Sequence, residues 1–194
     1  MNTLKAEKRS LDVKAKKLRR EGYVTGNVFG REIEKSIPVK MTKKDVDRIL
    51  KTENKGSQVA LEIDGKTYDA LIKEIVYNSM AGRVDEIDFQ ALVSNEKVNS
   101  VAEVIPLNYD RIQEGILQVK LNEISYRALP GALVDKIKID VGEMKVGDVI
   151  QVKDLSIASD ERIELLTNPE TVVVTVTAVH NAAPETEDSE ETAE

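Results

Sequence analysis

The chain has 194 residues, of which 41% are hydrophobic and 32% are charged, a globular balance with enough apolar material for two small cores. It contains no cysteine, which excludes disulfides and thiolate metal sites. The N-terminus lacks the apolar run of a signal peptide, and no segment reaches the roughly 18 apolar residues of a membrane helix, so we expect no membrane role.

The charge is divided unevenly along the chain. The net charge is −7, yet residues 1–97 sum to +4 and residues 98–194 to −11. The first twenty residues hold eight basic and two acidic side chains. Such a basic segment attracts phosphate locally, even on an acidic protein.

A short basic helix is predicted between Leu11 and Gly22. Leu11, Ala15 and Leu18 recur at i, i+4 and i+7, which gives one narrow apolar stripe. Basic residues fill the rest of the circumference, and Gly22 is suited to end the helix. Charge alone fits a solvated surface helix and a nucleic-acid contact about equally well.

Two strands and a second helix follow. Val24–Phe29 and Ile37–Met41 are β-prone runs with a turn region at Gly30 between them. Thr42 is suited to be an N-cap, with Asp45 favourable in the first turn. The predicted core face of this helix consists of Val46, Ile49 and Leu50.

A hairpin is the strongest local prediction, because Asp64-Gly65 favours the positive φ values of a type I′ turn. Alternating apolar residues flank it on both arms, at Val59, Leu61 and Ile63 and at Tyr68, Ala70 and Ile72. Further on, Ile87 and Phe89 share one strand face, and Glu86, Asp88 and Gln90 share the other. A polar row is therefore expected opposite a buried one.

A second β unit begins near Val98, where the composition becomes acidic and rich in β-branched residues. Ile116–Leu121, Ile137–Val141 and Val149–Val152 suit strands, with a turn at Gly147-Asp148. Thr171–Val179 carries no charge and suits a buried strand. No internal repeat relates the two halves.

Catalytic chemistry finds little support. His180 is the only histidine, and the chain has no phosphate-binding loop, dinucleotide fingerprint or nucleophile elbow. Asp85 and Asp88 could act as an acid and base pair on a glycoside, but with 4% aromatic residues and no Trp a sugar-stacking surface is thin. We therefore expect no enzyme, no metal site, no cofactor and no small-molecule substrate.

Several segments together carry a family resemblance. They are LKAEKR, KKLRREG, GNVFG, LEIDGKTYDALIKEI, EIDFQAL and SYRALPGALVDKIKIDVGEMKVGDVIQVKDL. In this order the chain resembles the bacterial large-subunit ribosomal proteins that bind 5S ribosomal RNA, in their long two-domain form, which is also called general stress protein Ctc. The resemblance covers nearly the whole chain except its C-terminal end.

The resemblance implies a mainly β fold with short helices. Residues 1–95 would form a 5S-rRNA-binding β-barrel similar to the anticodon-binding domain of glutaminyl-tRNA synthetase, and residues 96–181 an acidic β-rich domain. Residues 182–194, with six acidic and no basic residues, are expected to be a disordered tail. A cytoplasmic, ribosomal location is implied as well.

The resemblance also implies a binding site for the loop E region of 5S RNA. Basic residues would bind the RNA backbone, namely Arg9, Lys14, Lys17, Arg19 and Arg20. The polar strand with Glu86, Asp88 and Gln90 would lie near base edges, where Asp88 suits an acceptor in the wide minor groove of A-form RNA. Phe29 completes the predicted site.

The chain departs from the family pattern at three places. Glu86 stands where the family commonly has His, Phe29 where it has Tyr, and Asp12-Val13-Lys14-Ala15 where it has Gly-Lys-Gly. The first change replaces a possible donor with an acidic group that phosphate repels, and the second loses a hydroxyl.

Two functions are therefore weighed. The first is a ribosomal protein that binds 5S rRNA and contacts neighbouring large-subunit proteins through its acidic second domain. The second is a stress-related adaptor in which the acidic domain binds a protein partner and the basic helix binds acidic protein. The resemblance favours the first.

Overall fold

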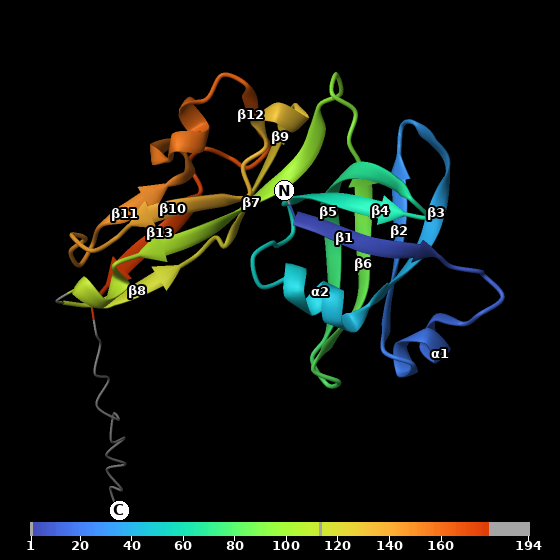
Figure 1. Cartoon of the computed structure of the whole chain (residues 1–194). Helices are drawn as coiled ribbons and strands as arrows, with labels where there is room; N and C mark the ends of the chain where they lie inside the picture. Colours follow the sequence, from blue (N-terminus) through green and yellow to red (C-terminus); the bar gives the residue numbers. More distant parts are fainter. Residues whose placement is uncertain (1, 113, 179–194) are drawn as a thin grey trace, which may run out of the picture.

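The computed structural model describes residues 2–112 and 114–178, and most of these residues lie in β-strands. Figure 1 shows two β units that follow one another along the chain. His180 and the predicted tail lie outside the described residues. No helix in the described ranges has the length and apolar character needed to cross a membrane.

The first unit is a closed barrel, with strand order β1-β3-β2-β6-β5-β4. The strands are β1 (Asn2–Lys8), β2 (Tyr23–Gly30), β3 (Ile33–Thr42), β4 (Gln58–Ile63), β5 (Lys66–Asn78) and β6 (Arg83–Ala91). Inward-pointing side chains fill the barrel, and Val28, Leu61 and Phe89 among them are completely buried. Closure leaves no unpaired strand edge in this unit.

Strand β1 is not predicted by the sequence pattern, yet it closes the barrel. It pairs in parallel with β4, from Asn2 opposite Val59, and antiparallel with β3. Only Leu4 and Ala6 of this strand are buried, between charged neighbours. Two alternating apolar residues are too short a pattern to identify a strand without its partners.

Helix α2 (Lys43–Ile49) forms where its cap was predicted. The Thr42 hydroxyl accepts a hydrogen bond from the Asp45 amide at 3.2 Å, and Val46 and Ile49 are buried in the barrel core. The predicted hairpin is also present, because Asp64 and Gly65 have φ values of 48° and 82° and Ile63 pairs with Lys66. Both predictions are confirmed.

Helix α1 (Ala15–Arg20) is shorter than predicted. It begins at Ala15 because residues 11–13 form a turn, in which the Ser10 hydroxyl donates to Asp12 at 2.7 Å. Leu11 is 77% exposed, so the predicted apolar stripe is wrong at that residue. Leu18 alone anchors the helix by burial.

The second unit consists of two small sheets. One has the order β10-β7-β9-β12 and the other β11-β13-β8. The strands are β7 (Val98–Leu107), β8 (Ile116–Val119), β9 (Glu123–Ala128), β10 (Lys136–Asp140), β11 (Val149–Gln151), β12 (Ile163–Leu165) and β13 (Val172–Thr177). Short 3-10 helices connect them, at η1 (Tyr109–Arg111), η2 (Pro130–Ala132), η3 (Val152–Asp154) and η4 (Ser156–Ser159). The overall fold is thus mainly β, as predicted.

The segment after α2 contacts the second unit. The Lys136 ammonium donates to the Thr52 carbonyl at 2.6 Å, and the Gln58 amide donates to the Pro130 carbonyl at 2.6 Å. A side chain at Gly56, whose φ is +90°, would lie 2.0 Å from the Val101 carbonyl oxygen. The predicted boundary at residue 95 lies between β6 and β7, and independent folding of the two units stays a prediction.

The Tyr126 hydroxyl ties the core of the second unit to the backbone at Val134. It donates to the Val134 carbonyl and accepts from the Val134 amide, both at 2.7 Å. Burial raises the pKa of Tyr126 above its usual 10.0, so the hydroxyl keeps its proton. Replacing Tyr126 with Phe leaves two backbone groups unpaired, and we expect a loss of about 1–3 kcal/mol in the free energy of unfolding.

Urea denaturation measures this loss. The control is Tyr109→Phe, because Tyr109 is 64% exposed and its hydroxyl makes no hydrogen bond within residues 2–112 and 114–178. Equal stability of the two variants would contradict the role given to Tyr126.

Candidate nucleic-acid interface

The outer surface of the β2/β6 pair is the candidate interface. The two strands are parallel, with Thr25 opposite Glu86 and Phe29 opposite Gln90. Residues paired in this way point to the same side of a sheet. The outward side chains of β6 alternate with Ile87 and Phe89, which are buried. The structure therefore brings the predicted polar row and Phe29 together on one wall of the barrel.

Asp88 is held in place by the neighbouring strand. Its Oδ1 accepts from the Asn27 amide at 2.9 Å and from the Asn27 side chain at 3.2 Å. Beside it, a side chain at Gly26 would lie 1.9 Å from the Ile87 carbonyl oxygen, so only glycine permits β2 to approach β6 so closely. The carboxylate is thereby oriented before any ligand binds.

Helix α1 presents three of the predicted basic residues to solvent. Lys14, Lys17 and Arg20 are exposed, while Leu18 packs inward. The Lys17 ammonium lies 3.9 Å from the Glu21 carboxylate, and 71% of the Lys17 side chain is exposed. Such a surface pair contributes little and leaves the cation available to a polyanion.

Arg19 is placed differently from its basic neighbours. Its guanidinium donates to the Asp85 carbonyl at 3.0 Å, to the Thr25 hydroxyl at 3.2 Å and to the Glu86 carboxylate at 3.3 Å. Only 23% of the side chain is exposed. Arg19 therefore fixes α1 to the β2/β6 pair, a role that its position in the basic segment does not reveal.

The ion pair between Arg19 and Glu86 bears on the effect of having Glu86 where the family commonly has His. The two side chains are 23% and 33% exposed, so their attraction is screened less than that of a surface pair. The guanidinium offsets the negative charge of Glu86 within the polar row. The repulsion of phosphate expected from the sequence is therefore reduced.

Arg9 lies at the start of the loop that leads to α1. Its amide donates to the Pro38 carbonyl at 2.8 Å, and its Nη2 donates to the Val13 carbonyl at 3.1 Å. Its Nε is buried and has no hydrogen-bond partner among the described residues. Pro38 on β3 pairs with Asn27 on β2, so two strands lie between Arg9 and the polar row of β6.

A network of polar contacts at one end of the barrel was not predicted from the sequence. Asn78 donates to the Asp85 carboxylate at 3.0 Å, and Arg83 pairs with the same carboxylate at 2.8 Å. Arg83 also donates to the Arg19 carbonyl at 3.2 Å, which ties α1 to the β5–β6 hairpin. At the tip of this hairpin Tyr77 and Met80 are 59% and 101% exposed. The link between α1 and the hairpin spans more than sixty residues, and no local pattern marks it.

The same network weakens the acid and base interpretation of Asp85 and Asp88. The hydrogen bond from Asn78 and the contact with Arg83 lower the pKa of Asp85 below its usual 3.8. A general acid needs the opposite shift. In residues 2–112 and 114–178 no cluster of three or more His or carboxylate side chains could hold a metal ion.

Comparison with known proteins covers both units. Residues 4–89 match the model of the Ribosomal L25p family, and residues 105–180 match that of the Ribosomal protein TL5, C-terminal domain. A relative from Caldanaerobacter subterraneus subsp. tengcongensis is 29% identical over 97% of this chain and 96% of its own length. One from Moorella thermoacetica is 30% identical over 92% of this chain and 86% of its own length. Both relatives are named large ribosomal subunit protein bL25.

A β-barrel with a basic helix and polar strand, followed by a matched second domain, defines a two-domain ribosomal protein. The chain belongs to the bL25 family of large-subunit ribosomal proteins, in its long, Ctc-type form. The resemblance stated from the sequence is confirmed, and the family is structural rather than enzymatic.

The Asp85 network predicts a pKa that depends on Asn78. Because the pKa of Asp85 is lowered in the folded protein, its ionised form contributes stability at neutral pH, and this contribution is lost as the pH falls from about 4 through the folded value. Replacing Asn78 with Ala should raise the pKa of Asp85 towards 3.8. A carboxyl carbon NMR titration measures it, with Ser79→Ala as the control. An unchanged pKa in Asn78→Ala would contradict the network.

Proposed function

We propose that this chain is a constituent of the large ribosomal subunit that binds the loop E region of 5S ribosomal RNA with the outer surface of β2 and β6 and with helix α1. The observation that carries the proposal is the set of bonds from Arg19 to Asp85, Thr25 and Glu86, which joins the basic helix to the polar row. Family membership supports the ribosomal role and its cytoplasmic location.

The two parts of this surface suit different parts of an RNA helix. Exposed cations at Lys14, Lys17 and Arg20 suit phosphate, which sets position and affinity. Asp88 and Gln90 suit the 2′-hydroxyls and base edges of the wide minor groove. Phe29, which is 37% exposed and paired with Gln90, offers an apolar contact at the end of the row.

Arg9 and Arg19 act in part through the protein. Arg19 holds α1 against the barrel and balances Glu86, so it positions the cations beside it. Arg9 orders the loop before α1 through its hydrogen bond to the Val13 carbonyl. This binding mode needs no cofactor and no metal.

The second unit is proposed to contact neighbouring ribosomal proteins or solvent. Residues 98–178 carry 13 acidic and 8 basic side chains, a net charge of −5, which opposes close packing on RNA. The adaptor function weighed from the sequence finds no separate support, because the family match spans both units.

The exposed bases of α1 should govern the salt dependence of binding. Replacing Lys14, Lys17 and Arg20 with Gln in the full chain leaves up to three phosphates without a neutralising cation. The slope of log K against log salt for a loop E fragment of 5S rRNA is negative, and it should become less negative by about 0.9 for each of these phosphates. Fluorescence anisotropy between 50 and 200 mM salt, roughly the range in which such ionic binding is resolved, measures the slope.

The matched control removes the same charge elsewhere. Lys138, Lys145 and Lys153 are exposed in the second unit, and their replacement with Gln should leave the slope unchanged. If both triple variants change the slope equally, binding follows net charge and the α1 interface is wrong.

Asp88 should govern selectivity rather than salt dependence. In Asp88→Asn an amide donor replaces one carboxylate oxygen, so the preference for the loop E fragment over an unrelated RNA duplex should fall roughly tenfold or more. Competition binding of the two RNAs measures this ratio, with Glu62→Gln on β4 as the control. An unchanged ratio in Asp88→Asn would remove Asp88 from the proposed site.

A further inference from the structure

Helix α2 carries a basic outer face that the proposed 5S interface does not use. Its inner residues Val46 and Ile49 are buried in the barrel core. On the outside, Lys44 and Arg48 lie one turn apart on the helix, and Lys51 follows the C-cap residue Leu50. All three are exposed and together form the basic stripe of this helix and its C-terminal end. Lys44 and Arg48 are about 6 Å apart along the helix axis, so the stripe can face more than one phosphate of a strand.

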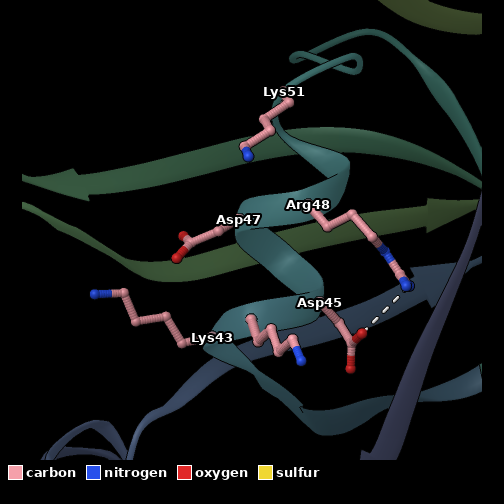
Figure 2. Close-up of a pocket in the computed structure, with 6 residues that line it drawn as sticks. Lys43, Asp45, Asp47, Arg48 and Lys51 are labelled. Atoms are coloured by element: carbon pink, nitrogen blue, oxygen red, sulfur yellow. Dashed lines mark ion pairs between the residues drawn. The ribbon is translucent and has the colours of Figure 1, made fainter.

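The face carries four cations and two carboxylates, so its charge is positive although Arg48 is paired with Asp45. An open hollow of about 590 Å³ is lined by residues of α2 and by the residue that follows its C-cap. Figure 2 shows these side chains around the helix. The lining residues are Lys43, Lys44, Asp45, Asp47, Arg48 and Lys51. Asp45 is occupied by the helix itself, since it accepts from the Thr42 hydroxyl at 2.7 Å and pairs with Arg48 at 3.2 Å. Across the described ranges, no carboxylate lies within 4.0 Å of the ammonium groups of Lys43, Lys44 or Lys51.

Helix α2 lies apart from the polar row of β6, although it adjoins β2 and the end of α1, which belong to the proposed 5S site. Helix α2 packs against β1, β3 and β2, whereas the polar row lies on β6. In the closed order, two strands separate β1 from β6 in either direction, so these strands lie on opposite walls. The Lys43 amide bonds to the Gly22 carbonyl at 3.0 Å, which keeps α2 at the barrel end beside the end of α1 (Figure 1). The polar row and the basic residues of α2 therefore face different parts of the barrel surface, and simultaneous binding of two RNAs tests whether one RNA helix covers both.

We propose that the stripe of Lys44, Arg48 and Lys51 binds the phosphate backbone of a second RNA segment, so that the barrel joins two RNA segments. The proposal extends the proposed function, on which it rests for the first RNA. The choice of RNA follows from charge complementarity. The outer face of α2 exposes more cations than carboxylates, with Asp47 the exposed acid, and no large apolar side chain, whereas a protein partner needs an apolar core to its interface.

The test uses the full chain, saturated with unlabelled loop E fragment to occupy the first site. A labelled, unrelated RNA duplex of about 20 base pairs, roughly two helical turns, is then added at about 0.15 M salt. We expect a ternary complex. K44Q/R48Q/K51Q should weaken binding of the duplex at least tenfold and leave that of the loop E fragment within twofold. The control K138Q/K145Q/K153Q should change neither.

Each other outcome overturns the proposal. Absence of a ternary complex removes the second site. If the α2 variant weakens the binding of both RNAs equally, one RNA site extends over α1, β6 and α2. If the two triple variants weaken binding equally, the duplex is bound by overall positive charge and not by α2. Binding of polyglutamate as tight as that of the duplex would assign the stripe to acidic protein. If the loop E fragment does not bind at all, the proposed function fails, and the duplex alone then tests α2 on the free chain.

Discussion

The ion pair between Arg19 and Glu86 is the contact on which the proposed RNA-binding surface depends, because it joins a six-residue helix to the wall of a barrel. Helix α1 is too short to be stable by itself, and it buries only Leu18. Its orientation is set by the three acceptors of Arg19 and by the bond from Arg83 to the Arg19 carbonyl. Once α1 is fixed, its exposed cations lie beside the polar row of β6, as the proposed binding to a single RNA requires. A partly buried pair of this kind is more important for geometry than for net stability.

The closed barrel supplies the second requirement, a surface that does not change shape. Gly26 allows β2 and β6 to approach, and Asn27 then holds the Asp88 carboxylate across the strand pair. The second unit is attached through the segment after α2, where the Gly56 backbone lies against Val101. The chain also passes directly from β6 into β7, so the second unit is connected to the barrel at both places.

Local features of the sequence predicted local structure well. Thr42 caps α2, Asp64-Gly65 makes the hairpin, and Glu86, Asp88 and Gln90 share the outer face of β6, since each depends on a short-range rule. The closed barrel was predicted only through the family resemblance. The remaining features depend on partners distant in the chain. Strand β1 forms because β3 and β4 pair with it. Arg19 binds Glu86, 67 residues away in the chain, and therefore does not extend into solvent. No spacing in the sequence encodes either relation.

The central claim is that α1 and the outer face of β6 contact one continuous stretch of RNA. Since the chain contains no cysteine, single Lys17→Cys and Gln90→Cys variants can each carry a tethered iron chelate that cleaves nearby RNA. The account predicts that both probes cut 5S rRNA within the same few nucleotides at loop E, and that a probe at Lys153→Cys in the second unit does not. Cleavage at separate, distant regions by the two barrel probes would contradict it.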